Sequence, residues 1–132
     1  MAFRTFEDIK AWQHSRELNK FLHEICKCSS VQRDKNWIDQ LTSASNSIMA
    51  NIAEGNDSKS DVEFARFLGY AKRSSTEVRS HLYYALDKNY ITQKEFDVLA
   101  GKTTEIAATL SGLMNYLYKS KKKLRSQGVI RD

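Results

Sequence analysis

The chain has 132 residues and a formal net charge of +5 at pH 7. This length is enough for one domain whose apolar core needs no disulfide or metal to stabilise it. Charged residues interrupt every apolar run before it reaches the roughly 20 residues of a membrane span, so the sequence excludes a membrane protein.

The excess positive charge lies at one end of the chain. Residues 119–132 contain six basic residues and one acidic residue, whereas the other 118 residues contain 15 of each. We therefore divide the chain into a single neutral domain over residues 1–118 and a basic extension over residues 119–132. The extension either continues the last helix or frays from it.

The two cysteines, Cys26 and Cys28, are separated by one residue, and no secretory signal with a basic start and an apolar run precedes them. We expect a reduced, cytoplasmic protein. The absence of proline leaves long segments without a helix breaker, so helices should dominate.

The first helix is predicted to begin at Thr5, whose hydroxyl can cap the backbone amide of Asp8. Glu7 and Asp8 then place negative charge in the first turn, where the helix dipole favours it. An apolar side follows at broken helical spacing, formed by Phe6, Ile9, Trp12, Leu18, Phe21, Leu22 and Ile25.

The second helix follows a polar link over residues 29–35. Its apolar positions recur at alternating steps of three and four residues, the spacing of one helix face. Gly55 is placed to end this helix in a left-handed cap. The apolar stripe consists of Ile38, Leu41, Ser45, Ile48 and Ile52.

Capping boxes open the third and fourth helices: Ser60 with Glu63, and Thr92 with Glu95. Within each box, the side chain of each residue accepts a hydrogen bond from the free backbone amide of the other. Asn89 between the two helices is a plausible left-handed stop. The third stripe consists of Phe64, Leu68, Ala71, Ser75, Val78, Leu82 and Ala85. The fourth consists of Phe96, Leu99, Thr103, Ile106, Leu110, Leu113, Leu117 and Leu124.

Short links make neighbouring helices antiparallel, and a repeat of three and four residues favours packing at about 20°. The predicted fold is therefore all-α, an antiparallel up-down-up-down four-helix bundle.

Polar residues lie beside two of these stripes. Taking Ile48 as pointing inward, an advance of 100° per residue places Ser47, Asn51 and Glu54 on one shoulder of the second helix. Either they complete hydrogen bonds between helices of one bundle, or they form a polar contact that orients another subunit. The third helix carries a matching stripe of Tyr70, Ser74, Glu77 and His81.

Small residues in or near the stripes predict that the second and third helices approach closely. A serine there can donate a hydrogen bond to its own preceding turn and so avoid an unsatisfied hydroxyl. These small residues are Ala44, Ser45, Ala71, Ser74 and Ser75.

Catalytic and metal-binding patterns are weak. No Glu-x-x-His occurs, which argues against a ferritin-like metal centre. His23, Cys26 and Cys28 offer three soft ligands, but a structural zinc needs four. No glycine loop suited to phosphates is present, and a cysteine–histidine catalytic pair lacks a third group. Glu54 and Glu77 could be proposed as paired carboxylates for acid–base catalysis, but nothing in the sequence indicates a pocket around them. We therefore expect no enzyme, no metal and no cofactor.

Three segments carry a family resemblance. Residues 47–55 (SIMANIAEG), 64–77 (FARFLGYAKRSSTE) and 6–12 (FEDIKAW) resemble the four-helix bundle proteins encoded in intervening sequences of bacterial 23S rRNA genes. The resemblance extends to about Tyr118, with departures at Arg73, where glycine is common, and in the basic extension.

That family is similar to the accessory variability protein of diversity-generating retroelements, a pentameric barrel that works with a reverse transcriptase and nucleic acid. The resemblance implies a bacterial homopentamer. The family's association with ribosomal RNA is inferred mainly from where its genes lie.

The extension suggests either a solubilising end or an arm that contacts phosphates. We expect a non-catalytic oligomer that binds nucleic acid, with RNA as the first candidate and DNA as the other. It should not read bases, because no aromatic residues alternate with the cations. The alternative is a protein–protein interaction scaffold with no nucleic-acid contact. The candidate phosphate contacts are Lys119, Lys121, Lys122, Lys123 and Arg125.

Overall fold

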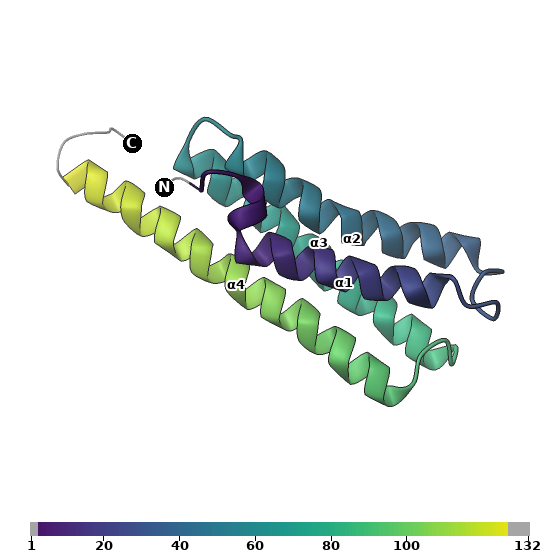
Figure 1. The fold of residues 1–132 in the computed structure, drawn as a ribbon. Helices are drawn as coiled ribbons and strands as arrows, with labels where there is room; N and C mark the ends of the chain where they lie inside the picture. Colours follow the sequence, from purple (N-terminus) through teal and green to yellow (C-terminus); the bar gives the residue numbers. More distant parts are fainter. Residues whose placement is uncertain (1–2, 127–132) are drawn as a thin grey trace.

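The computed structural model of the protein describes the backbone of residues 3–126 and the side chains of residues 3–119. Within residues 3–126 it contains a short 3-10 turn, η1 (Phe6–Asp8), and four α-helices with no strand. The helices are α1 (Lys10–Cys26), α2 (Lys35–Asn56), α3 (Asp61–Asp87) and α4 (Gln93–Ser126). Consecutive helices run in opposite directions (Figure 1). The predicted all-α four-helix bundle is confirmed.

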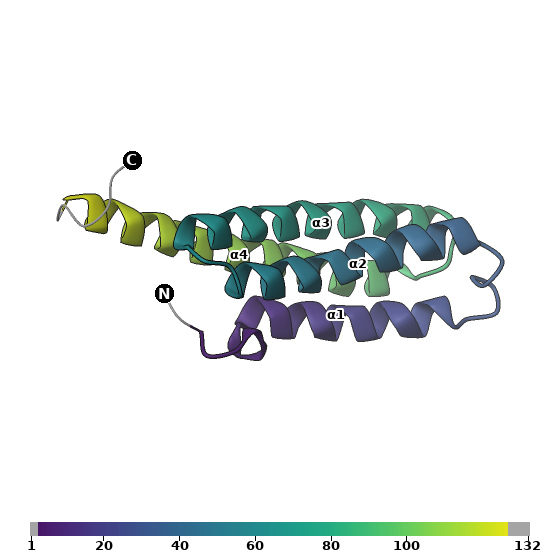
Figure 2. The same ribbon diagram turned by 90° about the horizontal axis from the view of Figure 1, so that it is seen from above.

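The helices form a square arrangement in which each packs on two others. α1 contacts α2 and α4, and α3 likewise contacts α2 and α4. α4 is the longest helix, and its C-terminal part extends beyond the ends of the other three (Figure 2). No described helix has a stretch that is both long and apolar enough to cross a membrane.

The core is formed mainly by the predicted stripes. All seven stripe residues of α3 are buried, as are Leu41, Ile48 and Ile52 of α2 and Ile106, Leu110 and Leu117 of α4. Removing one such large side chain from water contributes roughly 1.5 to 3 kcal/mol to stability.

Phe21 does not belong to the core, contrary to prediction, because 46% of its surface is exposed. The inward positions of this part of α1 are taken by Leu18 and Leu22, which are four residues apart and share one face. Phe21 is rotated by about 100° from Leu22 and therefore lies toward solvent.

The predicted start of the first helix at Thr5 is also wrong. The Thr5 side chain makes no capping hydrogen bond, and the Asp8 amide donates to the Thr5 carbonyl at 3.2 Å. α1 begins at Lys10, after an extended Ile9 that is 1% exposed. Burial of Ile9 and the edge-to-face contact of Phe6 with Trp12, at 5.0 Å between ring centroids, favour a turn here over a continuous helix.

The other helix starts are largely as predicted. Thr92 and Glu95 form the full reciprocal capping box, at 2.9 and 3.1 Å. Ser60 accepts from the Glu63 amide at 3.2 Å, but the Glu63 carboxylate pairs with Arg66 instead of returning to Ser60. The left-handed stop is confirmed at residue 89, where Asn89 has φ 60°.

Gly55 does not cap α2 in a left-handed conformation. The helix continues through Asn56, and its C-cap, Asp57, is in the right-handed region at φ −85°. Gly55 instead allows α3 to approach α2 closely, because a Cβ atom there would lie 2.8 Å from the Cβ of Phe67 and 3.0 Å from Cδ1 of Phe64.

Three serines bond across helix pairs and not to their own preceding turns. Ser45 Oγ donates to Asn19 Oδ1 of α1 at 3.0 Å, and Ser75 Oγ donates to the Thr103 carbonyl of α4 at 2.9 Å. Ser74 bonds to α2, as described below. The bonds within one turn that were expected of these serines are replaced by contacts that fix the relative positions of neighbouring helices.

Candidate functional site

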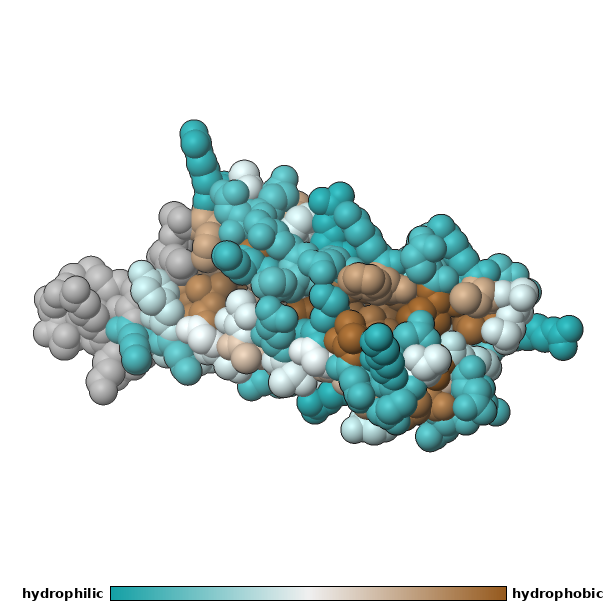
Figure 3. Space-filling model, turned by 60° about the horizontal axis from the view of Figure 1, so that its bottom comes forward, coloured by the Kyte–Doolittle hydropathy of each residue, from teal (hydrophilic) through white to brown (hydrophobic). Residues whose placement is uncertain are grey.

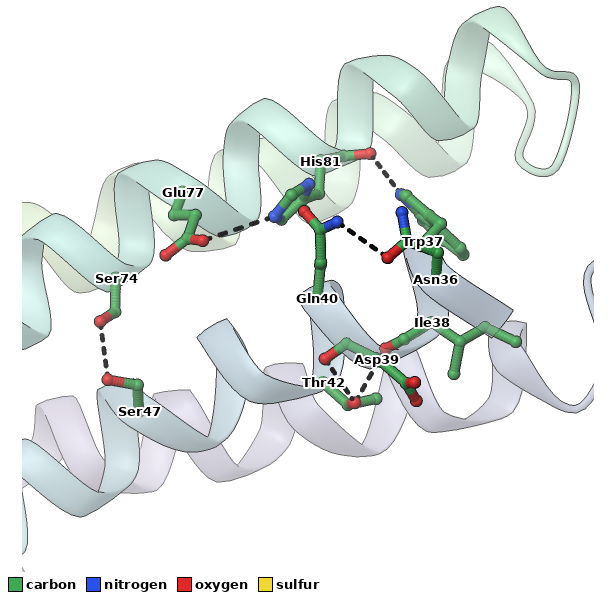
Figure 4. Close-up of polar contacts among 10 residues, drawn as sticks. All are labelled: Asn36, Trp37, Ile38, Asp39, Gln40, Thr42, Ser47, Ser74, Glu77 and His81. Atoms are coloured by element: carbon green, nitrogen blue, oxygen red, sulfur yellow. Dashed lines mark hydrogen bonds and ion pairs between the residues drawn. The ribbon is translucent and has the colours of Figure 1, made fainter. Parts of the chain in front are cut away.

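The polar shoulders of α2 and α3 face each other (Figure 4). Ser74 Oγ donates to Ser47 Oγ at 2.9 Å, and the Asn51 amide donates to the Ser47 carbonyl at 2.8 Å and to its Oγ at 3.0 Å. Ser74 is 9% exposed, and Ser47 and Asn51 are half-buried. These three residues therefore form one hydrogen-bonded group between helices, and a contact with another subunit through them stays a prediction.

Glu77 and His81 extend the same stripe along α3 (Figure 4). Glu77 Oε1 lies 3.6 Å from His81 Nε2, and that nitrogen is buried without a hydrogen-bond partner. The His81 backbone carbonyl accepts a hydrogen bond from the Trp37 indole at 3.1 Å. This end of the stripe thus places the buried imidazole nitrogen of His81 beside the carboxylate of Glu77.

Glu54 is not part of this group. It is exposed and lines a hollow of about 440 Å³ together with Arg4, Glu7 and Asp57. Glu54 lies beyond Asn51 toward the C-terminal end of α2, whereas Glu77 lies on the opposite side of the Ser47–Ser74 contact. The two carboxylates are therefore not brought together as an acid–base pair.

A polar cluster that the sequence did not reveal lies at the end of the bundle where α1 is linked to α2. Asp34 Oδ2 accepts hydrogen bonds from the hydroxyls of Tyr90, at 2.8 Å, and Tyr84, at 3.0 Å, while Oδ1 caps α2 at the Trp37 amide. The Tyr90 hydrogen bond is the main reason why the pKa of Asp34 is lowered, and the same bond raises the pKa of Tyr90 to about 12. The ring of Trp37 stacks on Tyr84 and tilts against Tyr90.

An apolar groove lies between α1 and α4. It has a volume of about 320 Å³ and is lined by Phe21, Ile25, Val98 and Leu99, with Glu24, Lys94 and Glu95 at its edges. Hydrophobic side chains gather on this face of the molecule (Figure 3). The exposed Phe21 that breaks the predicted pattern therefore contributes to a surface and not to the core.

The predicted phosphate contacts lie on the last part of α4. Lys119 is exposed, and the helix backbone continues through Ser126. The side chains of Lys121, Lys122, Lys123 and Arg125 lie outside the described residues. The helical backbone nevertheless places five basic residues within two turns of the projecting end of α4 (Figure 1).

Metal ligands do not gather in the part of the chain with described side chains: no group of three histidine, cysteine, aspartate or glutamate residues is placed to hold an ion. Cys26 is half-buried, and burial raises the pKa of its thiol, which disfavours the thiolate that a metal or a catalytic nucleophile requires. Cys28 is exposed, and its thiol contacts the Glu24 carbonyl at 3.8 Å.

A comparison with curated proteins found no match. Among solved structures, the chain is similar to a Bacteroides thetaiotaomicron protein of unknown function that is described as a member of the S23 ribosomal protein family. The two share 23% identity with a TM-score of 0.72, over 80% of this chain and 95% of the other, which supports the fold. The family model of the 23S rRNA-intervening sequence protein matches residues 7–112. With four-fifths of its length matched, the chain belongs to the 23S rRNA-intervening sequence protein family.

Proposed function

We propose that this protein is a non-catalytic accessory protein that binds RNA through the phosphate backbone, with the basic extension as its main contact. The observation that carries the proposal is the separation of charge along the chain, a neutral body followed by six cations and one anion in residues 119–132. Clustered cations on a projecting helix create a local field that attracts polyanions. The family name, which refers to an element of 23S rRNA, supports RNA over DNA as the ligand.

The experiment compares the full chain with a variant that ends at Tyr118. If about four cations of the extension contact phosphates, the slope of log affinity against log salt should be about 2.8 units shallower for the truncated variant on single-stranded RNA, at roughly 0.7 per contact. Equal affinity and equal slope for the two proteins would contradict the role of the extension.

We also propose a homopentamer, on the basis of the resemblance to the accessory variability protein of diversity-generating retroelements. Five copies would bring five basic extensions to one particle and multiply the local field. Sedimentation equilibrium tests this directly. The proposal expects five times the chain mass of 15.2 kDa, and a particle of one chain mass would contradict it.

A second candidate function, a protein–protein interaction scaffold, is favoured by the apolar groove between α1 and α4. Phe21 and Val98 expose 46% and 51% of their surfaces there, a combination more typical of interaction sites than of a fully solvated helix face. In this case the full chain would not bind RNA at any salt concentration.

A further inference from the structure

We infer that a groove between α3 and α4, flanked by Lys72 and Arg79, is a second contact site for the phosphodiester backbone. This inference rests on the proposed function and adds a site on the body of the bundle to the one on the extension. Lys72 and Arg79 are seven residues apart on α3, which places them about 10 Å apart along one helix face. Both are exposed.

The groove is a hollow of about 150 Å³. Its floor is formed by Ser75 and Thr103, which are 1% and 2% exposed. The Ser75 hydroxyl donates to the Thr103 carbonyl at 2.9 Å, so the two helices approach closely there, and short side chains leave open space above this contact. Liquid water occupies about 30 Å³ per molecule, so the hollow has room for several waters or for one phosphate group.

Charge distinguishes this hollow from others on the molecule. Its lining contains Lys72 and Arg79 and no carboxylate. Four other hollows on the described surface each have at least one carboxylate in their lining. An anion in the α3–α4 groove would therefore meet two cations without repulsion from its walls.

The two cations are also free to bind a ligand. In the part of the chain with described side chains, neither Lys72 nor Arg79 forms an ion pair or lies over an aromatic ring. Arg66, earlier on the same helix, is paired with Glu63 at 2.8 Å, and Lys102 is paired with Glu17 at 2.8 Å. Lys72 and Arg79 thus need not give up an existing partner to contact phosphate.

Two hydroxyls at the rim can assist. Thr76 Oγ1 donates to the Lys72 carbonyl at 3.3 Å, and Thr104 Oγ1 donates to the Ala100 carbonyl at 3.1 Å. Both bonds are longer than the usual 2.7 to 2.8 Å of hydroxyl donors, so a charged phosphate oxygen can compete for these protons.

The groove and the basic extension lie along one helix. Thr104 and Lys119 are fifteen residues apart on α4, about 22 Å at 1.5 Å per residue. One nucleic-acid strand that follows α4 would therefore meet the groove first and the extension next. Phosphate contacts of this kind position a strand without reading its bases.

The test uses the full chain and a single-stranded RNA, with affinity measured across a range of salt concentrations. Lys72→Gln with Arg79→Gln should weaken binding on the order of tenfold at low salt and make the salt slope shallower by about 1.4 units, two contacts at roughly 0.7 each. Arg33→Gln with Lys35→Gln is the matched control, since it removes one exposed arginine from the α1–α2 link and one exposed lysine from the start of α2, at the opposite end of the bundle from the extension.

A second variant keeps both cations in place. Thr104→Glu introduces a carboxylate at the rim of the groove and should weaken RNA binding while the thermal unfolding midpoint stays close to that of the wild type. The inference is overturned if the wild type binds RNA and both groove variants bind with the affinity and slope of the control pair, an outcome that leaves the proposed function standing. A wild-type chain that does not bind RNA overturns both.

Discussion

Asp34 connects segments that are distant in the sequence. Its carboxylate caps α2 and accepts hydrogen bonds from two tyrosines that lie 50 and 56 residues further along the chain. The cluster ties the α1–α2 link to the end of α3 and to the start of the α3–α4 link. Lys88, at the end of α3, adds a cation over the Tyr84 ring at 5.7 Å. One carboxylate thus organises the end of the bundle opposite to the basic extension.

The cluster predicts a distinctive dependence of stability on pH. The pKa of Tyr90 is about 12 in the folded protein and about 10 for an unperturbed tyrosine, so its contribution to stability is fully present below pH 10 and is lost as pH rises from 10 to 12. The lowered pKa of Asp34 gives a contribution that is present above about pH 4 and is lost as pH falls further.

Asp34→Asn should remove both effects, because the amide keeps an acceptor for the helix cap but carries no charge. The alkaline titration of the tyrosines, followed by ultraviolet absorbance, should then lose its component near pH 12. Tyr90→Phe serves as the control that identifies this component. Identical titration curves for wild type and Asp34→Asn would refute the assignment.

At the scale of elements, the contact of α2 with α3 depends on the missing side chain of Gly55. An added Cβ would meet the Cβ of Phe67 at 2.8 Å, and that atom cannot move away without a shift of the α3 backbone. Gly101 lies in α4 with nothing within 4 Å of its ideal Cβ position. The two glycines therefore have opposite requirements although both are helical.

Gly55→Ala should lower the free energy of unfolding by up to about 2 kcal/mol, since overpacking costs roughly 1 to 3 kcal/mol and alanine returns about 1 kcal/mol of helix propensity. Gly101→Ala should raise it by about 0.8 to 1 kcal/mol. Denaturant unfolding measures both changes. A stabilised Gly55→Ala protein would mean that α2 and α3 are not in close contact there.

The helices and most of their core could be predicted because the relevant signals are local and periodic. The reciprocal capping box of Thr92 and Glu95 and the left-handed conformation of Asn89 depend only on residues close together in the sequence. The exposure of Phe21 and the position of Gly55 inside α2 depend on which helix face meets a neighbour. A single sequence does not contain that information, since a glycine required for close packing has the same local signature as a glycine required for a cap.

The polar contacts were predictable in part for the same reason. Helical spacing placed Ser47 and Asn51 on one shoulder, and Ser74 on a matching one. It could not show that Ser74 meets Ser47 or that Ser75 bonds to α4, because both contacts depend on the register between helices. The Asp34 cluster and the α3–α4 groove also arise from residues on different elements, and neither has a signature in the sequence.

At the scale of the whole molecule, the proposed function assigns different roles to the bundle and to the basic extension. The apolar stripes and the serine contacts between helices stabilise a neutral body. In the proposed function, Lys72 and Arg79 of the α3–α4 groove and the basic residues in the sequence of the extension would form a path for a polyanion along one helix. If these groups bind phosphate and not base edges, as proposed, the protein should bind RNAs of unrelated sequence with similar affinity.

The most direct test of this account is the equilibrium affinity of the full chain for single-stranded RNA, measured from low to moderately high salt concentration with two RNAs of unrelated sequence. We predict a linear fall of log affinity with log salt, with a slope of about −4 for four phosphate contacts on the extension and two in the groove, and the same slope for both RNAs. Affinity that does not change with salt, or that differs strongly between the two RNAs, would contradict it.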